Sequence, residues 1–115
     1  MEILRPEQQV MQAALEVRSV RAELLAGNVA NADTPGYVGR DLKFEDALNR
    51  VVDSGSADPA GIETNDLIQN MRYDRNNIDV EREMAQVYSN ALSYVATLKL
   101  YGDSMARVAS ATSNS

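Results

Sequence analysis

The sequence predicts an all-α protein in which long N-terminal and C-terminal helices form a coiled-coil-like pair, with a short, loop-rich segment between them. Two observations lead to this prediction. Apolar residues recur at helical spacing near both ends of the chain, and the middle is short and interrupted by turn-forming residues. We divide the chain into residues 1–36, 37–78 and 79–115 and expect them to form one small domain.

The N-terminal helix is expected from about Glu7 to Ala32. Apolar residues follow one another there at alternating intervals of three and four, which aligns side chains on one face of a helix. One charged residue, Arg18, interrupts this stripe. The apolar members of the stripe are Met11, Leu15, Ala22, Leu25, Val29 and Ala32.

A sharp turn is predicted directly after this helix. Thr34 precedes Pro35, and a residue before proline is disfavoured in the α region, so the helix should end near Asn31 to Asp33. Pro35 and Gly36 suit the two central positions of a type II turn, because proline presets φ and glycine accepts a positive φ. We therefore expect the chain to bend before Tyr37.

The middle segment contains one further predicted helix. Apolar residues from Phe44 to Val52 follow the spacing of a short amphipathic helix. Residues 53–61 are small and polar, which is typical of an exposed linker. Residues 62–71 have too few apolar positions to distinguish an extended segment from a helical turn.

The C-terminal helix is expected from Asp79 onward, with Asp79 as its N-cap and residues 110–115 frayed. Its apolar residues keep a heptad spacing of three and four, which is typical of a coiled-coil seam. The seam consists of Met84, Val87, Ala91, Tyr94, Leu98, Tyr101, Met105 and Val108.

Composition excludes several classes of function. The 115 residues carry a net charge of −6 with scattered basic residues, which disfavours binding to nucleic acid or to an anionic membrane surface. The chain has no Cys and no His, so it lacks the usual thiol nucleophile, proton shuttle and metal ligand. No apolar run is long enough to span a membrane, and Glu2, Arg5, Glu7 and Glu16 interrupt any run of signal-peptide length. We predict no catalytic, cofactor-binding or metal-binding residue, no membrane insertion and no cleaved signal peptide.

Three groups of residues resemble chemical sites and are better explained structurally. Residues 74–79 match a calcium loop at its first ligand positions, but Asp79 stands where the turn glycine belongs. The acidic pairs Glu45/Asp46 and Glu81/Glu83 fall in predicted first helical turns, where the helix dipole favours them. The tyrosines of the last helix are explained as packing residues.

The stretch from Asn28 to Tyr37 reads Asn-x-x-Asn-x-x-Thr-Pro-Gly-Tyr. It resembles the N-terminal signature of the flagellar axial proteins, the family of rod, hook and hook-associated proteins. The stretch from Asn76 to Met84 resembles the entry to the last helix of the proximal-rod type, and the short middle segment agrees with that type. The resemblance covers both terminal helices and leaves residues 53–72 unmatched.

The resemblance implies a non-enzymatic subunit of the periplasmic rod, exported through the flagellar type III apparatus without cleavage. Its implied partners are other rod subunits, further copies of itself, the membrane-embedded ring protein and the rod-base adapter. The apolar stripes would then pack against neighbouring subunits, and we expect a free monomer to be poorly ordered at both ends. The predicted subunit-packing residues are Met11, Leu15, Ala22, Leu25, Asn28, Val29 and Asn31 in the first helix and Met84, Val87, Ala91, Tyr94, Leu98, Tyr101 and Met105 in the last, and the predicted turn is Thr34, Pro35, Gly36 and Tyr37.

Two questions stay open at this point. Asn28 and Asn31 either cap the last carbonyls of the helix or form hydrogen bonds to an adjacent subunit. The alternatives for function are another axial or rod-adapter protein, a generic coiled-coil adaptor or export chaperone, and a small hydrolase that uses carboxylates. The last ranks lowest, because no pocket-forming pattern accompanies the acidic residues.

Overall fold

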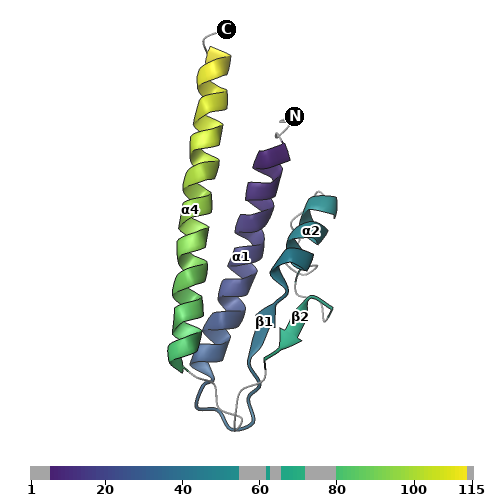
Figure 1. Cartoon of the computed structure of the whole chain (residues 1–115), viewed down its shortest axis with the longest axis vertical. Helices are drawn as coiled ribbons and strands as arrows, with labels where there is room; N and C mark the ends of the chain where they lie inside the picture. The colour runs from purple at the N-terminus through teal and green to yellow at the C-terminus, as the bar shows by residue number, and fades with distance from the viewer. Residues whose placement is uncertain (1–5, 55–61, 63–65, 72–79, 114–115) are drawn as a thin grey trace.

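A computed structural model describes residues 6–54, 62, 66–71 and 80–113 of the chain. In chain order its elements are α1 (Pro6–Ala30), β1 (Arg40–Leu42), α2 (Phe44–Ser54), β2 (Ile68–Asn70) and α4 (Val80–Ser113). The molecule is elongated, measuring 62 by 26 by 16 Å, with α1 and α4 along its long axis (Figure 1). The prediction of a helical protein with long terminal helices in contact is confirmed.

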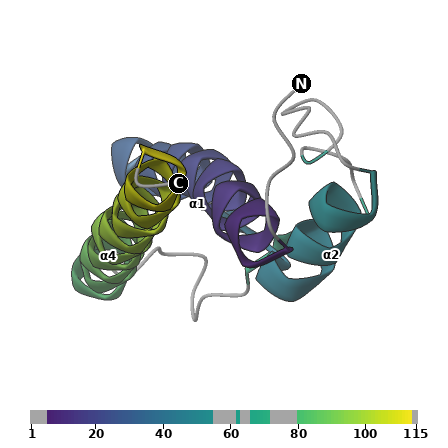
Figure 2. The ribbon, with the colours of Figure 1, turned by 90° about the horizontal axis from the view of Figure 1, so that it is seen from above.

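Helix α1 lies between α2 and α4. The view along the long axis places α4 on one side of α1 and α2 on the other (Figure 2). Helix α4 runs antiparallel to α1 and, at 34 residues, spans about 51 Å against about 37 Å for the 25 residues of α1. The C-terminal end of α4 therefore reaches beyond the start of α1 (Figure 1).

The hydrophobic core lies between α1, α2 and the strands, and not between α1 and α4. Four residues of α1 at intervals of four, three and four supply one side of it, and β1, α2 and the segment around β2 supply the other. The buried members are Ala13, Val17, Val20, Leu24, Leu42, Ala47, Val51, Ile62 and Leu67. This row on α1, which is not the predicted stripe, thus packs against other elements of the same chain.

Local sequence explains where the first two helices begin. Pro6 opens α1 at the position where a missing backbone N–H costs nothing, and Glu7 suits the positive end of the helix dipole. In α2, Glu45 and Asp46 occupy the first turn, and the amide of Ala47 donates to the carbonyl of Lys43 over 2.9 Å. These two helices match the predicted ones closely.

The predicted type II turn is confirmed. Gly36 has φ of 76°, and the Tyr37 amide donates to the Thr34 carbonyl over 3.2 Å. After this turn the chain returns along α1 as β1 (Figure 1).

The structure adds a two-stranded antiparallel sheet that was not predicted. Arg40 pairs with Asn70 and Leu42 with Ile68, so the ambiguous segment from 62 to 71 is extended at β2. Each strand has only three residues, which is too short for an alternating pattern to stand out.

Helix ends differ slightly from expectation. Asp53 and Ser54, assigned to the linker, belong to α2, and α4 continues through residues 110–113, which were expected to fray. The rest of the predicted linker, the 74–79 turn and the Asp79 cap lie outside the described residues.

Candidate functional site

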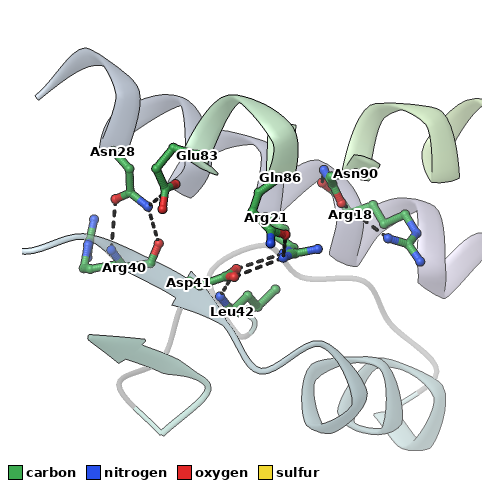
Figure 3. Close-up of polar contacts among 9 residues, drawn as sticks. All are labelled: Arg18, Arg21, Asn28, Arg40, Asp41, Leu42, Glu83, Gln86 and Asn90. Atoms are coloured by element: carbon green, nitrogen blue, oxygen red, sulfur yellow. Dashed lines mark hydrogen bonds and ion pairs between the residues drawn. The ribbon is translucent and has the colours of Figure 1, made fainter. Parts of the chain in front are cut away.

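The end of α1 is joined to β1 and α4 by one fully buried side chain, Asn28. Its Nδ2 donates to the Arg40 carbonyl over 2.8 Å and to Oε2 of Glu83 over 3.2 Å, while its Oδ1 accepts from the Arg40 amide over 2.9 Å and from the Tyr37 hydroxyl over 3.1 Å. Figure 3 shows Asn28 between Arg40 and Glu83. Both donors and both acceptor positions of the amide are used within the chain.

Asn31 has a different role. Its Nδ2 donates to the carbonyl of Gly27 over 2.9 Å, and its Oδ1 accepts from the Thr34 hydroxyl over 3.3 Å. Asn31 therefore caps the last turn of α1, as one of the two hypotheses held. Asn28 does not cap α1, because its amide forms hydrogen bonds to β1, the turn and α4.

Polar side chains meet across the contact between α1 and α4. The buried positions of α4 are Glu83, Asn90 and Ser104, each one residue before a predicted seam position. They and Gln86 meet polar residues of α1 in antiparallel order. We call these contacts the polar rungs: Asn28 with Glu83, Arg21 with Gln86 at 3.0 Å, Arg18 with Asn90 at 3.4 Å, and Gln8 with Ser104 at 3.0 Å.

Arg21 extends one rung to the sheet. Its guanidinium donates to both carboxylate oxygens of Asp41 in β1, over 2.9 and 3.0 Å, and to Gln86 in α4 (Figure 3). The hydrogen bond to Asp41 raises the pKa of Arg21, and burial opposes it only in part. The Arg21 guanidinium thus links α1, β1 and α4. The side chains of its ion pair with Asp41 are 17% and 14% exposed.

The predicted packing residues occupy several environments. Leu25 and Asn28 are buried, and Ala22, Ala91 and Leu98 are exposed. The others are half-buried: Met11, Leu15, Val29, Asn31, Met84, Val87, Tyr94, Tyr101 and Met105. The seam of α4 is therefore turned partly away from α1, because the polar rungs take the inward positions.

The opposite side of α4 exposes a row of apolar side chains. Leu92 is 73% exposed, and no charged residue occurs between Glu83 and Lys99. The row consists of Tyr88, Leu92 and Val95, with Leu98 and Leu100 on its two flanks, and we call these five residues the outer face of α4. An exposed apolar surface of this kind, whose first charged residue is Lys99 near its C-terminal end, is typical of an interaction site.

A groove of about 300 Å³ lies between α1 and α4 beside the outer face. It is lined by Arg18, Ser19 and Ala22 of α1 and by Val87, Asn90, Ala91, Tyr94 and Val95 of α4. Ala22, Val87, Ala91 and Tyr94 are predicted packing residues, so the structure brings both helices' stripes to one concave surface. Sequence reasoning missed the groove because its walls are far apart in the chain.

The residues considered for chemistry lie where the structural explanations put them. Glu45 and Asp46 are in the first turn of α2, and Glu81 and Glu83 in the first turn of α4. Among the described residues, no group of acidic side chains is arranged to hold a metal ion. Within the same ranges, no helix has the length and apolar character needed to cross a bilayer.

Comparison with known proteins gives relatives along most of the chain. No protein-family model matches it. The chain is 32% identical to the flagellar basal body rod protein FlgB of Salmonella typhimurium over 115 aligned positions, covering 82% of this chain and 83% of the relative. It is 31% identical to FlgB of Yersinia enterocolitica, covering 79% and 82%, and 33% identical to FlgB of Escherichia coli K12, covering 76% and 78%.

Proposed function

Because the chain belongs to the family of FlgB flagellar basal body rod proteins, we propose that it is a subunit of the proximal rod that assembles through its terminal helices. It is a helical structural protein and not an enzyme. The single observation that supports assembly most directly is the outer face of α4, where large apolar side chains have no covering partner within the described residues. Covering them returns about 25 cal/mol per Å² of apolar surface buried.

The groove, which is lined by both α1 and α4, also supports assembly through the terminal helices. Ala22 and Ala91 are exposed and small, and they stand on opposite walls. Small side chains let a ridge of a neighbouring helix approach closely, as ridges-into-grooves packing requires. We propose that the groove and the outer face together form the subunit-packing surface, to which the exposed and half-buried packing residues predicted in the terminal helices contribute; Leu25 and Asn28 are buried within the chain.

The proposed partners are further copies of this chain, other rod subunits, the membrane-embedded ring protein and the rod-base adapter. The proposed location is the periplasmic rod, reached by type III export without cleavage. In this role the subunit would pass torque along the rod through helix contacts. The family membership supports the rod, and the packing surface supports contact between subunits.

Locating the chain in purified basal bodies tests the proposal. A strain lacking the chain should build no rod beyond the membrane ring, and an epitope-tagged copy should restore the rod and be found at its membrane-proximal end by immunoelectron microscopy. Finding the tag elsewhere along the axis would favour another axial or adapter protein. Finding it only in the cytoplasm would favour an export chaperone.

A further inference from the structure

The row of the outer face belongs to a longer exposed stripe that follows α4 from Glu81 to Ser113. Its residues recur at intervals of three or four, which places them on the side of α4 away from the polar rungs. Every one of them is exposed: Glu81, Ala85, Tyr88, Leu92, Val95, Lys99, Gly102, Ala106, Ser110 and Ser113. We call these residues the outer stripe. A spacing sustained over this length is typical of a helix that packs lengthwise against another helix.

Two members of the outer stripe are charged, and their charges are opposite. Glu81 and Lys99 are 18 residues apart, which corresponds to five turns of an α-helix and a rise of about 27 Å. The apolar row lies between them. Lys99 contacts Asp103 at 3.7 Å, but both side chains are largely exposed, so this contact contributes little and leaves the amine accessible to a carboxylate of another chain.

The C-terminal end of α4 extends beyond α1. Ser104 meets Gln8, which lies in the first turn of α1, and α4 continues for more than two turns after Ser104 (Figure 1). Residues 109–113 are all exposed. A short helical segment is marginal in water without tertiary packing, so this end of α4 is stabilised by a neighbour that covers it.

We infer that α4 packs in parallel against α4 of a second copy of this chain, displaced along the axis by five turns, about 27 Å. This inference rests on the proposed function and specifies one contact within the rod. Glu81 of one copy then faces Lys99 of the next copy. Five turns return a helix to the same direction, so the apolar row of one copy, Tyr88, Leu92 and Val95, faces Ala106, Ser110 and Ser113 of the next.

This displacement satisfies the charges and covers both parts of the outer stripe. A parallel pair without displacement would set Glu81 against Glu81 and Lys99 against Lys99, which is unfavourable. An antiparallel pair would match Glu81 with Lys99, but it would leave the end of α4 beyond α1 uncovered and would close after two copies. In the displaced pair the two contacting surfaces differ, so each copy can bind a further one, as an extended rod requires.

Disulfide trapping tests the register, because the chain has no Cys of its own. A chain with Tyr88→Cys and Ala106→Cys should form covalent dimers and longer products when purified basal bodies are oxidised, since each copy carries both sides of the contact. The matched control combines Tyr88→Cys with Arg107→Cys. Position 107 is also exposed but lies about 100° further round the helix, and it should give on the order of tenfold less product. Tyr88→Cys with Leu92→Cys reports an antiparallel pair and should stay monomeric.

A charge exchange measures the contribution of the ion pair to assembly. Glu81→Lys and Lys99→Glu should each lower incorporation into rods on the order of threefold or more, because each sets like charges against one another. The chain that carries both substitutions should recover most of the incorporation. Glu45→Lys is the matched control and should assemble normally, since Glu45 is an exposed acid in the first turn of α2, as Glu81 is in α4.

The outcomes separate this contact from the proposed function. The inference is overturned if chains present in basal bodies give no more product from positions 88 and 106 than from positions 88 and 107, or if positions 88 and 92 give dimers. It is equally overturned if the doubly substituted chain assembles no better than the chains with one reversed charge. Absence of the unsubstituted chain from basal bodies would instead refute the proposed function.

Discussion

The hydroxyl of Tyr37 donates a hydrogen bond to Oδ1 of Asn28, nine residues earlier, over 3.1 Å. This bond closes a loop that contains the Pro35–Gly36 turn. Within the loop, Asn31 caps α1 and accepts a hydrogen bond from the Thr34 hydroxyl. The Asn-x-x-Asn-x-x-Thr-Pro-Gly-Tyr stretch is therefore one hydrogen-bonded unit that shapes the end of α1 and directs the chain into β1.

Replacing Asn28 by Ala should destabilise the free subunit by about 2–4 kcal/mol, because it removes four hydrogen bonds that join the end of α1 to β1, the turn and α4. Asn31→Ala, in the same signature, should cost only about 1 kcal/mol, since it removes a cap at a half-buried position. Urea denaturation followed by circular dichroism measures both. Equal losses would mean that Asn28 does not join the elements as described.

Gly36→Val should destabilise the subunit by about 1–3 kcal/mol, because φ of 76° is strained for a β-branched residue. Space is not the reason, since an added Cβ at Gly36 meets nothing within 4 Å. Gly102→Ala is the control: it also meets nothing, lies inside α4, and should stabilise by about 0.5–1 kcal/mol. Thermal unfolding of the two variants should shift in opposite directions.

Leu92→Asp should abolish incorporation into rods while leaving the stability of the free subunit within about 0.5 kcal/mol, because Leu92 is exposed in the subunit. Val17→Asp should unfold the subunit, at a cost of about 4 kcal/mol or more, because that position is fully buried. Asn49→Asp, on the exposed side of α2, controls for added negative charge and should assemble normally. Motility and basal-body yield report assembly; an assembling Leu92→Asp chain would remove the outer face from the packing surface.

A double-mutant cycle on Arg21→Met and Asp41→Asn should give a coupling energy of about 1–3 kcal/mol, as expected for a bidentate pair shielded from solvent. The same cycle on Lys99 and Asp103 should give about 0.3–0.5 kcal/mol, since that pair is an exposed i, i+4 contact at 3.7 Å. Salt at 1 M should weaken the second coupling more than the first. Similar values would show that the Arg21 pair is solvated in solution.

Amide exchange in the free subunit should be slowest from Val17 to Leu25, where α1 faces the core, and fastest from residues 109 to 113, which are all exposed in α4. From the sequence we expected a free monomer that is poorly ordered at both ends. Because α1 packs against α2 and the strands within the chain, we now predict that α1 is protected in the free subunit. Uniform exchange along both helices would contradict the packing of α1 against α2.

Sequence reasoning found the elements that repeat a pattern over many residues. The stripes of α1 and α4 and the Pro35–Gly36 turn were predicted because spacing and backbone chemistry are local properties. Which face of each helix points inward was harder to predict from the sequence. An inward row of Ala13, Val17, Val20 and Leu24 also has helical spacing and could have been found as a further stripe on α1.

The inward face of α4 could not be found in this way. A hydrophobic pattern treats Glu83, Asn90 and Ser104 as outward positions, and they are buried only because α1 offers a polar partner at each level. Which polar residues meet depends on the antiparallel register of two segments separated by the whole middle of the chain. The groove between α1 and α4 follows from that register, so it too required the structure.

The polar rungs also give the helix pair a mechanical property. An apolar seam can slip along its axis with little change in buried area, but a slip of one turn, about 5.4 Å, would break every rung from Gln8 to Asn28 at once. Hydrogen bonds at four levels along the pair therefore oppose sliding of one helix past the other. In this subunit the polar rungs keep α1 and α4 in one axial register. The apolar outer face of α4 stays available for contact with a neighbouring subunit.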